Sequence, residues 1–293
     1  MKGGLQPVIK WSGSKRRVAQ ALHRLWPKDM RKEARYFEPF IGSGAMLPHR
    51  PLESAFVGDV IGPLIELWRF IQSEPERVAA YYSALWHERE ARGHEVFYEA
   101  RDRFNTEGNP LDFLVLSRMC VNGLIRFNTS GEFNNSLHHT RPGIHPERLA
   151  SLLHQWSERL RGVHFEAQDY EQTLDGAREG DLVFLDPPYV GTRGRYRPEP
   201  FDLERFSAQL AELNQKGVLW MLTFDGSAGK RSYSEGTISP DLYRHRFQIR
   251  TGHSPFTRLM KRSLDEVSEC LYLNFEPNDP SLFDEGGGQQ GVC

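Results

Sequence analysis

The sequence has 293 residues, of which 39% are hydrophobic and 26% are charged, and 37 Lys and Arg residues nearly balance 39 Asp and Glu residues. This composition excludes a disordered chain, and the length suits one large core with an insertion, since single cores stop growing near roughly 250–300 residues. No apolar stretch approaches the ~20 residues that span a bilayer and the N-terminus lacks a secretion signal, so we expect a cytoplasmic protein without membrane contact. Cys120, Cys270 and Cys293 have neither disulfide nor zinc-site spacing, and we expect no metal.

The charge is unevenly distributed along the chain. Residues 1–36 contain ten basic and two acidic residues, and residues 230–262 contain eight and two. A basic face can therefore exist although the formal net charge is −2. Solvated helix faces would produce the same clusters, so the charge alone leaves a nucleic-acid partner open.

The hydrophobic pattern predicts an α/β core. In chain order it predicts a helix at 18–25, a strand at 53–59, a strand at 182–185, a helix at 203–213 and a strand at 218–224. The last two strands are continuous apolar runs, which is typical of parallel strands covered by helices on both faces. Parallel strands need helical connections between them, and the predicted helix at 203–213 supplies one.

A largely helical stretch interrupts this core between residues 63 and 160. Apolar residues recur in it at helical spacing over residues 64–71, 78–86, 111–119 and 149–160. Residues 122–143 are rich in Gly, Asn, Ser, Thr and His, and they predict an irregular loop or hairpin. We therefore expect a discontinuous core, an inserted helical domain and a flexible tail, formed respectively by residues 1–62 with 161–277, by 63–160 and by 278–293.

The first motif with chemical meaning is Phe-Glu-Pro-Phe-Ile-Gly-Ser-Gly-Ala at residues 37–45. Gly42 and Gly44 allow the backbone to approach a ligand, and a helix N-terminus after them would offer unpaired N–H groups. Leu47 stands where a dinucleotide-binding motif has its third glycine, which disfavours NAD. Asp59, at the end of the next predicted strand, is placed to accept hydrogen bonds from ribose hydroxyls. The pattern indicates a nucleoside cofactor without a pyrophosphate.

The second motif, Asp-Pro-Pro-Tyr at residues 186–189, follows an apolar strand at the end where open α/β sheets bind ligands. Its prolines fix the backbone, so the Asp186 carboxylate and the Pro187 carbonyl can face one cleft. Both groups are acceptors for the two N–H groups of a base's exocyclic amine, and holding both directs the nitrogen lone pair toward an electrophile. Tyr189 offers a ring on which the base can stack. A rigid proline turn that only closes the strand is the alternative.

With these motifs in this order, the sequence resembles the D12 class of N6-adenine DNA methyltransferases, the family of DNA adenine methylase (Dam). The resemblance extends to about residue 276 and includes three further cofactor segments, Lys10–Lys15, Gly58-Asp59-Val60 and Gln168-Asp169-Tyr170. It also includes the DNA-reading hairpin, with Val121–Asn128 and Gly131–Asn134. The resemblance implies a Rossmann-like, S-adenosylmethionine-dependent methyltransferase core with an inserted helical DNA-recognition domain. It further implies a prokaryotic or phage protein associated with the nucleoid.

The resemblance assigns roles to individual residues. Asp186 and the Pro187 carbonyl would orient N6 of a flipped adenine, and Tyr189 would stack on the base. The S-adenosyl-L-methionine site would comprise Trp11, Lys15, Glu38, Pro39, Phe40, Gly42, Gly44, Asp59, Asp169 and Asp186. Double-stranded DNA would contact Asn122, Leu124, Arg126, Asn128, Asn134 and Arg141. Arg126 is the candidate for a guanine edge, and a structural arginine in the hairpin is the alternative.

The sequence departs from the family pattern at two places. Residues 135–143 replace the Val-Pro-Phe-Gly of Dam-like enzymes, so GATC recognition does not follow from the resemblance, whereas a recognition site with an adenine does. Thr223-Phe224-Asp225 replaces the Ser-Asn-His of relatives at the border of the target pocket.

The sequence therefore predicts a site-specific adenine methyltransferase that acts in restriction-modification or as an orphan enzyme. An N4-cytosine methyltransferase and a catalytically inactive DNA-binding relative are the alternatives. No cysteine follows a proline, which disfavours a C5-cytosine enzyme. We also expect a monomer or weak dimer, and a weak contact of residues 279–283 with a replication sliding clamp.

Overall fold

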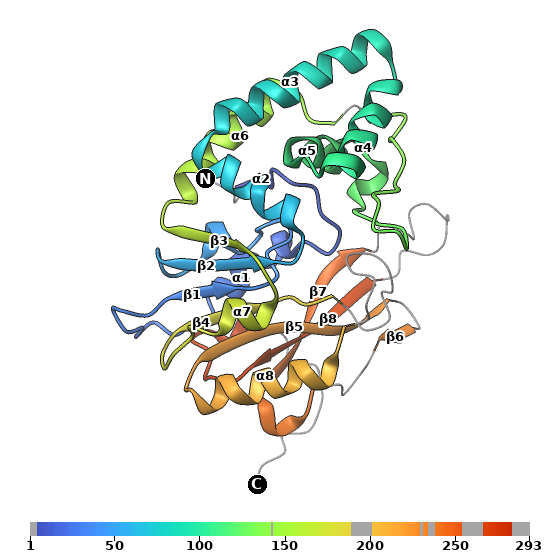
Figure 1. The fold of residues 1–293 in the computed structure, drawn as a ribbon. Coiled ribbons are helices and arrows are strands. Elements are labelled where there is room, and N and C mark those ends of the chain that lie inside the picture. The colour runs from blue at the N-terminus through green and yellow to red at the C-terminus, as the bar shows by residue number, and fades with distance from the viewer. Residues whose placement is uncertain are drawn as a thin grey trace.

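A single mixed β-sheet runs through the centre of the molecule, with helices packed on both of its faces (Figure 1). The computed structural model describes residues 5–141, 143–188, 201–228, 231–233, 238–253 and 266–282. Two residues that carry predictions, Tyr189 and Phe283, lie outside the described residues. None of the helices in these ranges has both the length and the apolar character needed to cross a membrane.

Within the described residues the sheet has eight strands, with five parallel strands followed by an antiparallel region. The order is β3-β2-β1-β4-β5-β8-β7, and β6 pairs with β5 outside this path. Pairing is parallel from β3 through β5, whereas β8 is antiparallel to both β5 and β7. The strand bounds are β1 Tyr36–Glu38, β2 Ala55–Asp59, β3 Val163–Ala167, β4 Leu182–Leu185, β5 Leu219–Ala228, β6 Arg231–Tyr233, β7 His245–His253 and β8 Glu266–Leu273.

Five of the eight α-helices in the described chain fall between β2 and β3. The helix bounds are α1 Ala19–His23, α2 Gly62–Ser73, α3 Pro75–Arg92, α4 Glu95–Glu107, α5 Pro110–Met119, α6 Pro146–Arg159, α7 Tyr170–Leu174 and α8 Leu203–Gln215. Short 3-10 helices are η1 Lys15–Arg17, η2 Leu47–His49, η3 Val121–Gly123, η4 Pro240–Leu242 and η5 Pro280–Leu282. Helices α2, α3, α5 and α6 each have a proline in the first turn, where its missing N–H costs no hydrogen bond.

The two faces of the sheet are covered by two hydrophobic clusters. Leu182 and Phe184 belong to the larger cluster, and Val183 and Leu185 to the smaller, as the alternation of side chains along β4 requires. The smaller cluster includes the apolar face of α8. The larger one extends from the sheet through α2 into α3–α6, which gather at the end of the molecule opposite α8 (Figure 1). The division into residues 1–62, 63–160 and 161–277 stays a prediction.

The predicted α/β fold is confirmed, and each of the helices and strands named from the hydrophobic pattern has a counterpart in the structure. Residues 122–141 form an irregular hairpin held by two isolated bridges, Cys120 with Leu137 and Phe127 with Phe133. The pattern missed the helices α4 and α7 and the strands β3, β6, β7 and β8. In all of these elements, charged residues are interspersed with the apolar ones.

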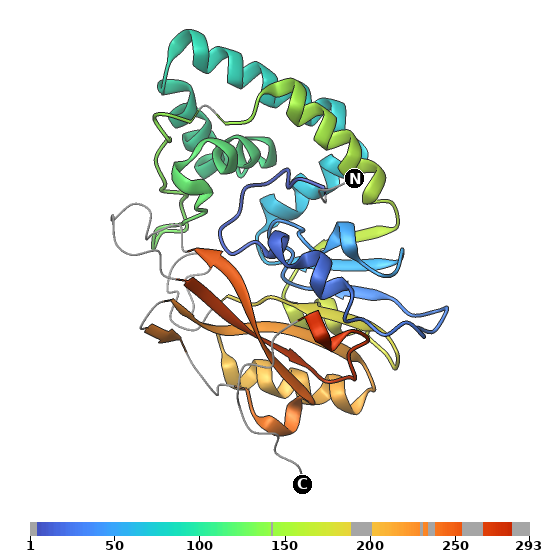
Figure 2. The same cartoon turned by 180° about the vertical axis from the view of Figure 1, so that it is seen from behind.

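The first residues of the predicted tail contact the segment after α1. The Asn278 backbone N–H donates to the Leu25 carbonyl oxygen at 3.0 Å, and Arg24 pairs with Asp279 at 2.5 Å. These contacts place η5 beside α1 on the face seen in Figure 2. Residues 278 and 279 therefore contact residues 24 and 25, and a flexible tail over residues 278–293 stays a prediction. The contact of residues 279–283 with a sliding clamp stays a prediction.

Candidate active site

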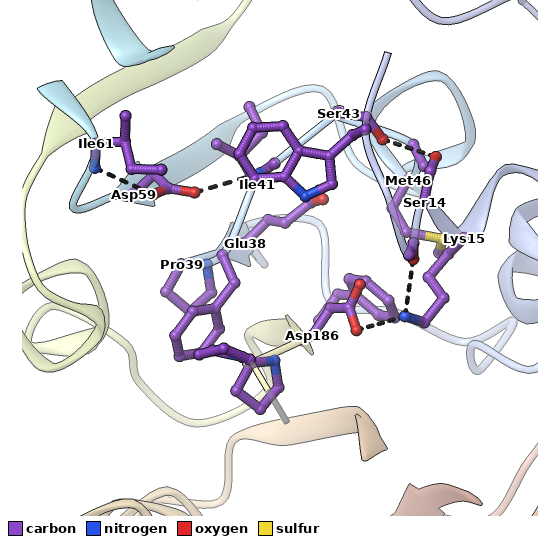
Figure 3. Close-up of a pocket in the computed structure, with 18 of the residues that line it drawn as sticks. Ser14, Lys15, Glu38, Pro39, Ile41, Ser43, Met46, Asp59, Ile61 and Asp186 are labelled. Carbon is purple, nitrogen blue, oxygen red and sulfur yellow. Dashed lines mark hydrogen bonds and ion pairs between the residues drawn. The ribbon is translucent and has the colours of Figure 1, made fainter. Parts of the chain in front are cut away.

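A pocket opens at the carboxyl ends of the parallel strands, where the strand order changes direction. The chain passes from β1 to β2 on one side, and β4 pairs with β1 on the other. Open α/β sheets bind ligands at such a switch point, because the loops diverge there and leave a crevice. The lining comes from residues 11–15, 38–43, 45–46, 59–61, 184, 186–188 and Phe201 (Figure 3).

The glycine loop after β1 is shaped by its backbone conformation. Gly42 has a φ of +45° and its N–H donates to Asp59 Oδ2 at 3.3 Å. A Cβ atom at this position would lie 3.0 Å from the indole nitrogen of Trp11, so glycine lets the Trp11 ring pack on the loop. Gly44, at φ +62°, packs against Trp68 instead and does not line the pocket. Its role in cofactor binding stays a prediction.

Asp59 lies at one side of the pocket, at the end of β2 (Figure 3). Its Oδ2 accepts from the Gly42 N–H, and its Oδ1 accepts from the Ile61 N–H at 3.1 Å. These two bonds fix the orientation of the carboxylate. Its role as an acceptor for ribose hydroxyls stays a prediction.

Glu38 lies between Asp59 and Asp186 in the pocket (Figure 3). Its side chain is only 2% exposed and accepts a hydrogen bond from the Tyr36 hydroxyl at 3.0 Å. Burial raises the pKa of this carboxyl to about 8; the Tyr36 hydrogen bond opposes that shift, and the negative charge of Asp186 adds to it. Glu38 is therefore mostly protonated at neutral pH, and a cation bound nearby would favour its ionised form.

Asp186 follows β4 at the opposite side of the pocket. Its Oδ1 accepts from Lys15 Nζ at 2.6 Å and from Thr223 Oγ1 at 2.9 Å. Lys15 Nζ also lies 3.4 Å from Glu269 Oε2. Burial raises the pKa of Asp186, and the positive charge of Lys15 opposes this shift. Pro187 is buried beside Asp186 and lines the same pocket.

Phe40 and Asp169, two other predicted cofactor residues, differ in their relation to the pocket. Phe40 lines it, and its ring stacks on Tyr170 with the centroids 5.5 Å apart. The side chain of Asp169 accepts from the Glu171 N–H as the N-cap of α7, and it lies 3.7 Å from Arg205. It does not line the pocket. A strand-end acid can thus serve as a helix cap, which sequence alone does not distinguish from a ligand contact.

The predicted DNA-contacting residues gather on the hairpin, away from the pocket lining. Arg126 is exposed, and its guanidinium donates to the Asn134 side chain at 2.7 Å and to the Asn134 carbonyl oxygen at 3.3 Å. The Asn128 side chain closes the hairpin turn by accepting from two backbone N–H groups. Asn134 and Asn128 therefore organise the hairpin itself.

The base of the hairpin touches the loop that leads into the pocket. Asn122 has a φ of +57°, and the next residue, Gly123, also has a positive φ. The Lys10 side chain occupies the space that a Cβ of Gly123 would need, which joins the hairpin to the segment that carries Trp11 and Lys15. Leu124 is half-buried and Arg141 is exposed. The base of the hairpin thus contacts the residue that directly precedes the pocket lining at Trp11.

Sequence reasoning missed two polar residues beside Asp186. In the sequence, Thr223 stands out only as a departure from the family pattern, and Glu269 belongs to no motif. Glu269 is 4% exposed and directly precedes the apolar run Cys-Leu-Tyr-Leu of β8. A carboxylate buried in such a strand needs a partner, and this was the available signal.

Comparisons with known proteins agree with the geometry. The sequence profile of the D12 class N6 adenine-specific DNA methyltransferases matches residues 11–204, which contain both motifs. The type II methyltransferase M1.LlaDCHI of Lactococcus lactis subsp. cremoris is 27% identical, over 94% of this chain and 97% of that protein. The retron Ec67 DNA adenine methylase of Escherichia coli is 29% identical, over 82% of this chain and 81% of that protein. The DNA adenine methylase of Escherichia coli strain K12 is 28% identical, over 70% and 74%.

Proposed function

The chain belongs to the D12 class of N6 adenine-specific DNA methyltransferases, and we propose that it methylates N6 of an adenine flipped out of duplex DNA, with S-adenosylmethionine as donor. The observation that carries this proposal is the Asp186 carboxylate, held beside Pro187 at the side of the pocket opposite Asp59. A target amine and a nucleoside cofactor could then meet inside one crevice.

The residues of the pocket fit a cationic nucleoside cofactor. Asp59 would accept hydrogen bonds from ribose hydroxyls, and the absent side chain of Gly42 leaves room for the Trp11 ring. Glu38 and Asp186 supply carboxyl groups whose ionised forms a positive ligand would favour. When bound, S-adenosylmethionine supplies a methyl group that the sulfonium charge activates.

The target base would be held by the second motif. The Asp186 carboxylate and the Pro187 carbonyl would each accept one N–H of the adenine N6 amine, which directs the nitrogen lone pair toward the donor. The N6 amine is inside the duplex until the base is flipped, so base flipping is required. We infer that Tyr189, outside the described residues, stacks on the flipped base.

Duplex DNA would lie across the hairpin and the basic N-terminal segment. Phosphate contacts from Lys and Arg supply affinity without sequence preference, whereas a side chain that reaches a base edge supplies specificity. Arg126 is exposed and oriented by Asn134, which suits the second role. The alternative in which the chain only binds DNA is disfavoured by the intact set of Gly42, Asp59 and Asp186.

Transfer of a tritiated methyl group to unmethylated duplex DNA, followed by analysis of the nucleosides, tests the proposed function. We expect N6-methyladenine; N4-methylcytosine as the sole product would refute it in favour of the cytosine alternative. Asp186→Ala should abolish transfer while cofactor affinity falls far less. Asp175→Ala is the matched control, because Asp175 is an exposed acid directly after α7. This variant should transfer the methyl group at the wild-type rate.

A further inference from the structure

The surroundings of Asp186 contain more charge than the proposed chemistry uses. Both hydrogen bonds described for its carboxylate fall on Oδ1, one from the Lys15 ammonium and one from the Thr223 hydroxyl. The other acceptor within reach of that hydroxyl, the Leu185 carbonyl oxygen, is farther away at 3.4 Å. One carboxylate oxygen is thus occupied, and Oδ2 is left as the acceptor for a substrate.

A second carboxylate holds Lys15 from the other side. Glu269 Oε2 lies 3.4 Å from Lys15 Nζ, and the two side chains are 5% and 3% exposed. Removing an ammonium and two carboxylates from water is costly, so such a cluster contributes little net stability by itself. Its members come from three elements that are far apart in the sequence, with Lys15 in η1, Thr223 in β5 and Glu269 in β8.

We propose that Lys15, Thr223 and Glu269 are positioning residues that hold Asp186 Oδ1 and so present Oδ2 to the target amine. This inference rests on the proposed function and deepens it. It gives Lys15 a role other than the cofactor contact that the family resemblance implied. It also gives a task to Glu269, which lies outside the range that the family profile matches.

The two charged partners act on Asp186 in opposite directions. The positive charge of Lys15 lowers the pKa of the Asp186 carboxyl, and the negative charge of Glu269 raises it, while burial raises it most. The remaining titratable neighbour among the described residues is Glu38 of β1, which is itself hydrogen bonded to Tyr36. A protonated Asp186 is a weaker acceptor for an amine, so Lys15 and Glu269 would shift the acidic limit of activity in opposite directions.

This opposition gives a test by direct titration. The protein is labelled with ¹³C at the aspartate carboxyl carbons, and Asp186→Asn assigns the signal of Asp186. Lys15→Met should move its titration to higher pH and Glu269→Gln to lower pH. Thr223→Val should move it to higher pH, and Thr223→Ser, which keeps the hydroxyl, should restore it. Arg16→Met and Glu276→Gln, at exposed positions on η1 and after β8, should leave the Asp186 signal unchanged.

Single-turnover methyl transfer gives the functional readout. The acidic limb of the pH–rate profile should shift in the same directions in the same variants. At neutral pH, Lys15→Met should lower the transfer rate on the order of 100-fold, the typical loss when a reacting group is misplaced. The dissociation constant of the cofactor should change little. A large rise in that constant with an unaltered rate would make Lys15 a cofactor ligand and overturn the proposal.

The titration separates this inference from the proposed function, because it measures the ionisation of the Asp186 carboxyl group and does not depend on which base is methylated. Shifts of the same sign in Lys15→Met and Glu269→Gln, or no shift in either, would overturn the inference even for an active adenine methyltransferase. N4-methylcytosine as the product would refute the proposed function and leave the titration as a test. If Lys15→Met does not fold, as judged by circular dichroism, the shift in Glu269→Gln still decides.

Discussion

Glu38 combines complete burial with a position inside a pocket that suits a cation. Burial raises its pKa to about 8 from an ordinary value of 4.5. The folded protein therefore holds this proton more tightly than the unfolded chain does. Below about pH 4.5 Glu38 is protonated in both the folded and the unfolded protein, so it does not change the free energy of unfolding. As pH rises from there to about 8, the unfolded chain ionises Glu38 and the folded protein does not, so the free energy of unfolding falls.

Replacement of Glu38 by glutamine should remove this pH dependence, because the glutamine amide is neutral throughout. Relative to wild type, Glu38→Gln should gain free energy of unfolding as pH rises from 5 to 8, by an amount on the order of 1–5 kcal/mol. Urea unfolding at several pH values measures the difference. Parallel pH dependences in the two proteins would show that Glu38 does not change its ionisation on folding.

Cofactor binding gives an independent check on the same residue. Because a bound cation favours the ionised carboxylate, wild-type affinity for S-adenosylmethionine should rise with pH toward about 8, with protons released on binding. Calorimetry in buffers of different ionisation enthalpy counts those protons. Glu38→Gln should bind more weakly and lose the part of the proton release that comes from Glu38.

At the scale of elements, the hairpin supports its recognition residue with its own side chains. Asn134 accepts from the Arg126 guanidinium through its side chain and its backbone carbonyl. Two of the arginine's hydrogen-bonding groups are thereby fixed, which limits the conformations of the exposed guanidinium. A side chain that is ordered before binding loses less entropy when it contacts a base edge.

Arg126→Ala should reduce discrimination at a single G·C pair of the recognition site by about 1–3 kcal/mol, because one guanine contact is lost. Asn134→Ala should reduce discrimination at the same pair by less, since it frees Arg126 without removing it. The measurement is kcat/KM on duplexes with single base-pair changes. Arg161→Ala, at an exposed arginine after α6, is the control. Equal losses on every duplex would make Arg126 a phosphate contact.

The elements that form the pocket were predictable because each carries a local signal. The apolar run of β4 followed by Asp186 and Pro187, and the glycines after β1, mark strand ends without knowledge of the fold. Parallel topology then brings those ends to one edge of the sheet. The pairing of Lys15 with Glu269 had no such signal, since it depends on the antiparallel register of β8 on β5. Long-range register is set by the whole core and not by neighbouring residues.

At the scale of the whole molecule, the helices α2–α6 and the sheet share one hydrophobic cluster. Trp68 of α2 stacks parallel to Phe165 of β3, and its ring centroid lies 5.0 Å from that of Trp156 in α6. The Trp68 indole also donates to the Gly42 carbonyl oxygen at 3.2 Å. Trp68 thus connects α2 and α6 to the glycine loop of the pocket.

This shared core leads us to expect one cooperative unfolding transition for the sheet and the helices. Leu153 in α6 is fully buried, so Leu153→Ala should destabilise the protein by about 2–5 kcal/mol through lost burial and a cavity. Hydrogen exchange measured at increasing urea gives the free energy of opening for each peptide. Leu153→Ala should lower this free energy by the same amount in peptides of α6 and of β4. Ser151→Ala, at an exposed position of α6, should change neither the free energy of unfolding nor the exchange of these peptides. If α6 alone were weakened while β4 kept its protection, the inserted helices would unfold as a separate domain.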